Sequence, residues 1–173
     1  MRIVTCSYER HATAILAILN DAIATTTALF DYEPRSPESM VEWFRLKTSR
    51  QFPVIGAEDD AGGLRGFATY GTFRAWPAYK YSVEHSIYVH KDHRRRGVAL
   101  ALMERLIDLA KAQRYHTLVA GIDAANAPSI ALHERLGFAY AGTIREAGFK
   151  FGRWLDLAFY QRLLPTPVDP RDG

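Results

Sequence analysis

A short run of arginines that ends at a glycine carries the clearest chemical signal in this sequence of 173 residues. The run and its continuation comprise Arg94, Arg95, Arg96, Gly97, Val98 and Ala99, between a predicted strand and a predicted helix. Backbone N–H groups and the positive dipole at a helix start favour a phosphate, and glycine lets the backbone approach it closely. A pyrophosphate site and a solvated basic turn both fit this pattern. The glycine spacings of the P-loop and of the dinucleotide fingerprint are absent.

A carboxylate interrupts the predicted strand that precedes this turn. Residues 81–89 alternate in polarity, which places His85 on one face of the strand and Glu84 on the other. A half-buried glutamate has a raised pKa and can accept a proton from an ammonium group. A solvent-facing strand glutamate would show the same spacing, so both interpretations of Glu84 stay open.

Arg74 ends another predicted strand and could hold a substrate carboxylate through paired hydrogen bonds, or could be an exposed edge arginine. The histidines at 85, 90 and 93 do not predict a metal site, because His85 and His90 point to opposite faces of a strand and no metal-binding helix motif is present. Cys6 has no neighbouring histidine in the sequence and is expected to fill core space.

Two segments together resemble the GNAT superfamily of acetyl-CoA-dependent N-acetyltransferases. The family signature Gln/Arg-x-x-Gly-x-Gly/Ala is matched by Arg94, Gly97 and Ala99. Residues 126–138 resemble the family's Asn-x-x-Ser/Ala helix with its Leu-Gly-Phe turn. Residues 73–74, 81–89 and 149–156 are similar to the phosphinothricin and methionine sulfoximine/sulfone acetyltransferase subfamily.

The resemblance implies that acetyl-CoA lies between two splayed parallel strands, residues 81–89 and 116–122. Its pyrophosphate would bind the arginine run, although Arg95 or Arg96 could instead face solvent. A strand amide near Val89 would donate to the thioester oxygen. The further cofactor contacts that it implies are Ile87, Tyr88, Val89, Asn126 and Ser129.

The resemblance also assigns the chemistry. Glu84 would be the general base, and His133 the general acid toward the sulfur, although a helix histidine can also be a packing residue. Arg74 would hold the substrate carboxylate. Phe30, Phe73 and His85 would shape the side-chain pocket, while aromatic residues near 30 equally fit core or dimer contacts.

We therefore expect an enzyme that acetylates the α-amino group of a small amino acid or analogue, such as phosphinothricin, methionine sulfoximine or methionine sulfone, by direct attack in a ternary complex. The alternative is a GNAT enzyme that acts on another amine, a protein N-terminus or an aminoglycoside. The resemblance implies a homodimer, and acyl transfer itself needs no metal. Nucleic-acid binding is not expected, because the basic run contains no stacking aromatic residue.

Composition and pattern predict the elements that position these residues. A hydrophobic content of 48% and a net charge of +3 are typical of a globular protein. One cysteine and no uninterrupted apolar stretch predict a cytoplasmic protein without a membrane segment. We expect a single α/β domain over residues 1–164, with a mostly antiparallel mixed sheet, one parallel pair and flanking helices, and a loose tail over residues 165–173. Strands are expected at 2–7, 52–58, 64–73, 81–89, 116–122, 138–144 and 154–163, and helices around 15–23, at 37–49, from 98 and at 127–136.

Overall fold

The computed structural model describes residues 1–172, whose strands form one mixed sheet in the order β1-β2-β3-β4-β5-β7-β6. Strands β4 and β5 are parallel in an otherwise mostly antiparallel sheet, which confirms the predicted fold class. The elements are β1 Arg2–Thr5, α1 Tyr8–Thr25, α2 Pro37–Ser49, β2 Val54–Glu58, β3 Leu64–Thr72, η1 Pro77–Tyr79, β4 Ser82–Val89, η2 Lys91–His93, α3 Val98–Ala112, β5 Thr117–Asp123, α4 Ala127–Arg135, β6 Ala139–Lys150 and β7 Arg153–Leu163. No helix in the described part of the chain has the length and apolar character needed to cross a membrane.

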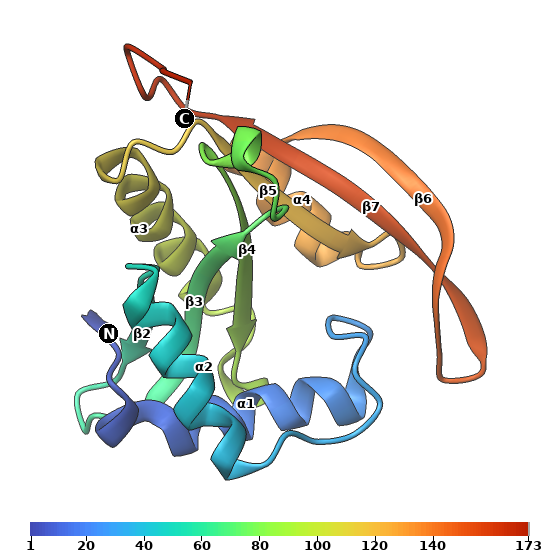
Figure 1. Cartoon of the computed structure of the whole chain (residues 1–173). Helices are drawn as coiled ribbons and strands as arrows, with labels where there is room; N and C mark the ends of the chain where they lie inside the picture. The colour runs from blue at the N-terminus through green and yellow to red at the C-terminus, as the bar shows by residue number, and fades with distance from the viewer. Residues whose placement is uncertain (173) are drawn as a thin grey trace. The chain divides into compact units, whose positions relative to one another are not determined.

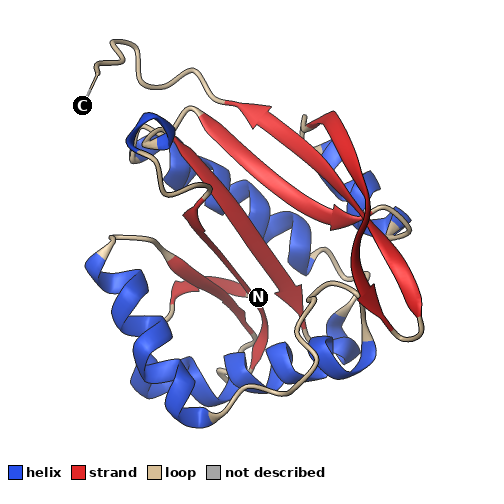
Figure 2. Cartoon of the chain, turned by 45° about the vertical axis from the view of Figure 1, so that its right-hand side comes forward, coloured by secondary structure: helices blue, strands red, loops and turns tan. Residues whose placement is uncertain are grey.

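One compact unit consists of Met1–Thr69 and Ser86–Leu106. Its helices α1 and α2 pack against each other (Figure 2). Buried side chains recur at helical spacing along α1, and they join Phe44 of α2 and Phe67 of β3 in an apolar core. Tyr88 packs against this core, so the core supports the end of the strand that leads into the arginine run.

Helix α2 begins where its sequence predicts. Ser36 is the N-cap and its hydroxyl accepts a hydrogen bond from the Ser39 amide at 3.4 Å, while Pro37 occupies the first helical position. The helix ends at Ser49, which confirms both predicted boundaries.

A buried carboxylate ties together three elements of the same unit. Glu58 of β2 accepts hydrogen bonds from Arg2 at 2.8 Å, from Arg10 at 3.0 Å and from Nε2 of His11 at 3.0 Å. The Ser7 amide donates to Nδ1 of His11, so the His11 proton lies on Nε2 and faces Glu58. Every charge in this cluster therefore has an internal partner, and the cluster has a structural role.

The other compact unit consists of Tyr70–His85 and the chain from Ile107 onward. Strand β7 pairs with β5 on one side and with β6 on the other, and β6 and β7 form a long twisted hairpin (Figure 1). Strand β6 continues to Lys150, beyond the strand predicted over residues 138–144. The pairing register shifts between Ile144 and Gly148, and such an irregularity breaks the alternation from which the strand was predicted.

Candidate active site

The arginine run forms a turn whose backbone is shaped for an anion. Arg95 has a φ of 60° and Gly97 a φ of 78°, and α3 begins at the next residue, Val98. Left-handed residues in a short turn direct neighbouring N–H groups into one concavity, and the helix start adds its positive dipole. A Cβ added at Gly97 would meet no heavy atom within 4 Å, so the space in front of this backbone is open.

The arginine side chains differ in their partners. Nη2 of Arg94 lies 3.6 Å from Oδ2 of Asp21, a residue of α1 in the same unit. Arg95 and Arg96 are exposed and form no ion pair within the described chain. The turn therefore offers two free guanidinium groups and one that already has a carboxylate beside it.

The end of β4 precedes this turn in the chain. Ile87, Tyr88 and Val89 are half-buried, and the Tyr88 ring lies 5.5 Å from the Phe67 ring. A Cβ added at Gly66 of β3 would lie 2.8 Å from the Tyr88 carbonyl oxygen, a distance that real side chains do not tolerate. Glycine at 66 thus permits the close approach of β3 to this segment.

Glu84 is the third residue of β4 and lies opposite Val119 in the parallel β5. A Cβ added at Gly121 of β5 would lie 3.0 Å from Oε1 of Glu84 and 3.4 Å from Cδ1 of Leu157. The carboxylate therefore occupies the space that the missing Gly121 side chain leaves on this face of the sheet. Partial burial raises the pKa of Glu84, and the positive charge of Arg74 opposes this rise. A carboxylate with a raised pKa is suited to proton transfer.

Arg74 follows β3 in the same unit as Glu84. Its guanidinium carbon lies 4.3 Å from the centre of the Phe73 ring, and Nη1 donates to the Phe73 carbonyl at 2.8 Å. The Phe73 and Tyr79 rings pack in a T-shaped arrangement with centroids 5.6 Å apart. Arg74 is exposed and pairs with no carboxylate of the described residues, so its charge is available to a carboxylate ligand.

Successive strand residues point to opposite sides, so His85 and Glu84 lie on opposite faces of β4. On its own face, His85 contacts His133 of α4. The two Nε2 atoms lie 2.9 Å apart and the rings are stacked with centroids 5.0 Å apart. Both side chains are buried, at 7% and 2% exposure.

The hydrogen bonds of His133 fix the protons of both rings. Its Nδ1 lies 2.6 Å from the Ser129 carbonyl oxygen, and a carbonyl can only accept, so the proton is on Nδ1. Nε2 of a neutral His133 is then an acceptor, and His85 donates to it from its own Nε2. Nδ1 of His85 is left without a hydrogen bond of normal geometry in the described chain.

Burial favours the neutral form of both rings. It lowers the pKa of His85 to about 3, His133 acts in the same direction, and the Val119 backbone opposes the shift. Burial also lowers the pKa of His133, while the Ser129 carbonyl opposes the change. In the neutral state neither ring nitrogen of His133 is free for an outside partner.

The first turn of α4 holds Asn126 and Ser129. Asn126 is the N-cap, and its Oδ1 accepts from the Ser129 amide at 3.2 Å. The Ser129 carbonyl accepts from His133, so a hydrogen-bonded series runs from the start of α4 to His85 of β4. This series fixes the backbone of the turn that carries both candidate cofactor residues.

The remaining predicted residues lie elsewhere. Phe30 is 37% exposed in the segment between α1 and α2, in the first unit. No group of three or more potential metal ligands occurs among the described residues. His90 and His93 have ring centroids 5.4 Å apart, and His85 is engaged with His133.

Two residues next to the site were not predicted. Gly121 accommodates the Glu84 carboxylate, and Asp21 pairs with Arg94. A glycine inside a strand is a signal of close approach by another group, so Gly121 could have been identified from the sequence. Asp21 is one of many charged helix residues, and nothing in its sequence surroundings distinguishes it.

Comparison with known proteins gives this geometry a context. The model of the acetyltransferase (GNAT) family matches residues 16–138. The L-methionine sulfoximine/L-methionine sulfone acetyltransferase of Pseudomonas aeruginosa PAO1 is 43% identical over 157 residues, which cover 90% of this chain and 91% of that protein.

Two solved structures extend the comparison. An N-acetyltransferase from Staphylococcus aureus Mu50 is 48% identical, with a TM-score of 0.91 and coverage of 94% of this chain and 97% of the other. A GNAT superfamily phosphinothricin acetyltransferase from Sinorhizobium meliloti, in complex with acetyl-CoA, is 32% identical, with a TM-score of 0.93 and coverage of 98% and 91%.

Proposed function

Because this chain belongs to the GNAT acetyltransferase family, we propose that it transfers an acetyl group from acetyl-CoA to the α-amino group of a small amino acid or analogue. One observation carries the substrate class. Glu84 is a half-buried carboxylate, and Arg74 is an exposed guanidinium without a carboxylate partner in the described chain. Both belong to one compact unit, and the charge of Arg74 acts on the pKa of Glu84. These two groups complement the ammonium and the carboxylate of an amino acid. Methionine sulfone, methionine sulfoximine and phosphinothricin, after which the relatives are named, share both groups.

Acetyl-CoA is the acetyl donor in this proposal, and its thioester supplies the group that is transferred. The open turn in front of Gly97, with the left-handed Arg95, supports binding of the pyrophosphate there. Arg94 and Arg96 would add charge from the side, and Ala99 would keep the start of α3 uncrowded. The backbone of Ile87, Tyr88 and Val89 would pair with the pantetheine arm.

Glu84 would remove the proton from the substrate ammonium, directly or through one water. The free amine would then attack the acetyl carbon, and the carbon–sulfur bond would break as the amide forms in a ternary complex. An amide near Val89 would donate to the carbonyl oxygen as charge develops. The raised pKa of Glu84 supports this assignment, since a base works best when its pKa approaches the working pH.

For His133 we propose a positioning role. A neutral His133 already gives its one proton to the Ser129 carbonyl, and its other nitrogen accepts from His85. Donation to the sulfur would first require one of these bonds to open. A thiol has an ordinary pKa of about 8.5 and departs with little help, so holding Asn126 and Ser129 toward the cofactor is the more useful task.

Arg74 would hold the substrate carboxylate through two hydrogen bonds, while its guanidinium lies over the Phe73 ring. Phe30 would border the substrate side chain. His85 would support His133 and so affect the substrate through α4.

A substrate panel tests the proposed function. Consumption of acetyl-CoA is measured with amino acids, methionine sulfone, methionine sulfoximine, phosphinothricin, aminoglycosides and peptides with free N-termini. We expect turnover with the carboxylated amino acids and little with the others. Preferential turnover of an aminoglycoside or a peptide would replace the proposed substrate class with another amine.

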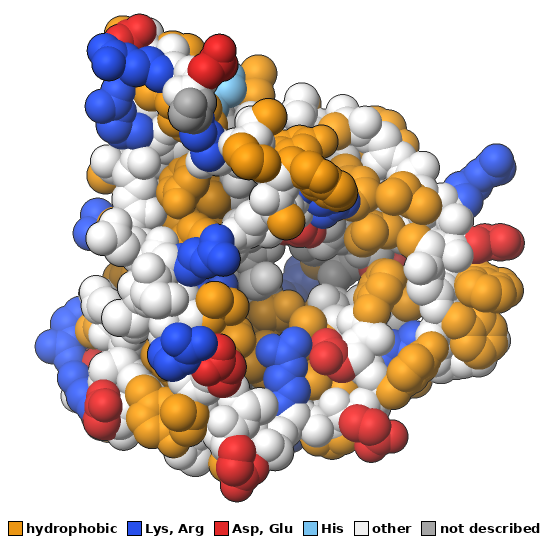
Figure 3. Space-filling model, in the orientation of Figure 1, with side chains coloured by type: hydrophobic (Ala, Val, Ile, Leu, Met, Phe, Trp, Pro, Cys, Tyr) orange, Lys and Arg blue, Asp and Glu red, His pale blue; other side chains and the backbone are white. Residues whose placement is uncertain are grey.

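We further propose a cytoplasmic homodimer. Exposed apolar side chains recur along the β6–β7 hairpin and its turn, and apolar surface is visible over this part of the molecule in Figure 3. They are Tyr140, Ile144, Phe149, Phe151 and Trp154, each between 46% and 60% exposed. A single, buried cysteine agrees with a reducing compartment. Light scattering coupled to size exclusion tests the dimer, and a mass of 19.5 kDa at micromolar concentration would disprove it.

A further inference from the structure

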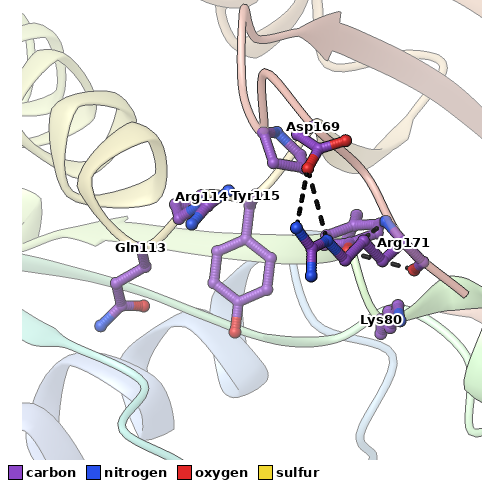
Figure 4. A pocket seen from close by; sticks show the side chains of 8 residues that line it. Lys80, Gln113, Arg114, Tyr115, Asp169 and Arg171 are labelled. Carbon is purple, nitrogen blue, oxygen red and sulfur yellow. Dashed lines mark hydrogen bonds and ion pairs between the residues drawn. The ribbon is translucent and has the colours of Figure 1, made fainter. Parts of the chain in front are cut away.

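A cavity of about 640 Å³ opens beside the starts of β4 and β5 in the second unit (Figure 4). Tyr81 precedes β4, Tyr115 precedes β5, and the C-terminal segment forms the opposite wall. None of its lining residues takes part in the proposed acetyl transfer. The lining residues are Lys80, Tyr81, Gln113, Arg114, Tyr115, Pro167, Asp169 and Arg171.

The charges around this cavity do not balance. Asp169 accepts from Arg171 at 3.1 and 3.3 Å, so the one acidic lining residue is already paired. Lys80 and Arg114 form no ion pair within the described chain. Three cations against one carboxylate leave two positive charges. The helix dipole commonly places a cation after a helix C-terminus, and this explains Arg114. It does not explain why three cations from three separate segments line one cavity.

Hydrogen bonds hold the wall formed by the C-terminal segment. The Tyr81 hydroxyl accepts from the Arg171 amide at 3.1 Å and donates to the Arg171 carbonyl at 3.3 Å. Nδ1 of His116 donates to the Thr166 carbonyl at 2.9 Å, and the Thr166 hydroxyl donates to the Tyr115 carbonyl. Hydrogen bonds within the described chain therefore hold this wall of the cavity in place.

We propose that this cavity is a binding site for a small phosphorylated molecule, separate from the acetyl-CoA site. A phosphate monoester carries between one and a half and two negative charges near neutral pH, which matches the excess of two positive charges. Its oxygens accept hydrogen bonds from several directions. This suits Lys80, Arg114 and Arg171, because the three cations come from separate segments of the chain. The Tyr81 and Tyr115 rings give the remainder of the ligand a partly apolar wall.

The test must separate this site from the nucleotide site at Gly97. Binding of AMP and of inorganic phosphate is measured by calorimetry on the full chain saturated with coenzyme A, with adenosine as the uncharged probe. The test variants are Lys80→Glu and Arg114→Glu. Lys111→Glu is the matched control, because it makes the same charge change in the last turn of α3, where Lys111 pairs with Asp108 at 3.4 Å outside the cavity.

We expect AMP and phosphate to bind the coenzyme-saturated protein and adenosine not to bind. Each test variant should weaken AMP binding by at least roughly threefold to tenfold, because the charge reversal removes one exposed charge-assisted contact and adds repulsion, and the control should bind as the wild type does. Absence of AMP and phosphate binding under coenzyme saturation would overturn the proposal. Equal weakening by Lys111→Glu would also overturn it, since attraction would then depend on total charge. Retained acetyl transfer by each variant verifies its fold.

Discussion

The buried histidine pair makes stability depend on pH in a way that can be calculated. His85 is 7% exposed and its folded-state pKa is lowered from 6.5 to about 3. A lowered pKa stabilises the folded protein above the unfolded value of 6.5, and this contribution is lost as the pH falls toward the folded value. Between about pH 7.5 and about pH 5 the unfolded histidine gains its proton and the folded one does not. The resulting loss is about 2 kcal/mol, and any folded pKa below about 4 gives the same figure.

The variant His85→Gln isolates this contribution, because an amide can still donate to Nε2 of His133 and does not titrate. Urea unfolding of wild type and variant at the two pH values gives the change in unfolding free energy for each. We expect the wild type to lose about 2 kcal/mol more than the variant, or roughly 4–8 °C in Tm for a chain of this size. His90→Gln, at a half-exposed histidine, is the control. Equal losses in wild type and His85→Gln would show that His85 is not held neutral by burial.

Three further substitutions test the proposed chemistry. Glu84→Gln should lower kcat by about 10²- to 10⁴-fold with little change in the KM for acetyl-CoA. It should also remove the acidic limb of the kcat/KM profile against pH, which lies above the usual glutamate pKa because the pKa of Glu84 is raised. An unchanged pH profile would remove Glu84 from the role of base. Arg74→Ala should raise the KM for the amino acid by roughly tenfold to a hundredfold, and a change confined to acetyl-CoA would contradict the carboxylate contact. Gly97→Ala places a side chain at a φ of 78°, so it should cost about 1 kcal/mol in stability and raise the KM for acetyl-CoA several-fold. If calorimetry shows that the variant binds acetyl-CoA as tightly as the wild type does, the pyrophosphate binds elsewhere.

Local signals predicted the elements well where one residue type dictates the backbone. Ser36 and Pro37 define the start of α2, and Gly97 marks the turn before α3. The extent of β6 was underestimated, because a register shift after Ile144 hides a long pairing with β7. The insertion of β7 between β5 and β6 depends on pairing across distant segments, which periodicity does not encode.

Side-chain contacts were harder to predict than elements. The alternation in residues 81–89 correctly separated Glu84 from His85, but could not show that His85 meets His133, 48 positions away on a helix. The expected role of His133 came from its position in a motif. Its proton state depends on the Ser129 carbonyl and on burial, and both arise only from tertiary packing.

In the proposed pyrophosphate site, the carboxylate of Asp21 would make the arginine turn selective as well as attractive. Any anion that approaches Arg94 must compete with a negative charge 3.6 Å from that guanidinium. A ligand that also satisfies the N–H groups of the turn gains enough from them to compete, whereas a flexible polyanion that offers charge alone meets repulsion from Asp21. Removing this one carboxylate should therefore strengthen the attraction of the turn for polyanions in general, and discrimination among phosphates would decline as affinity rose.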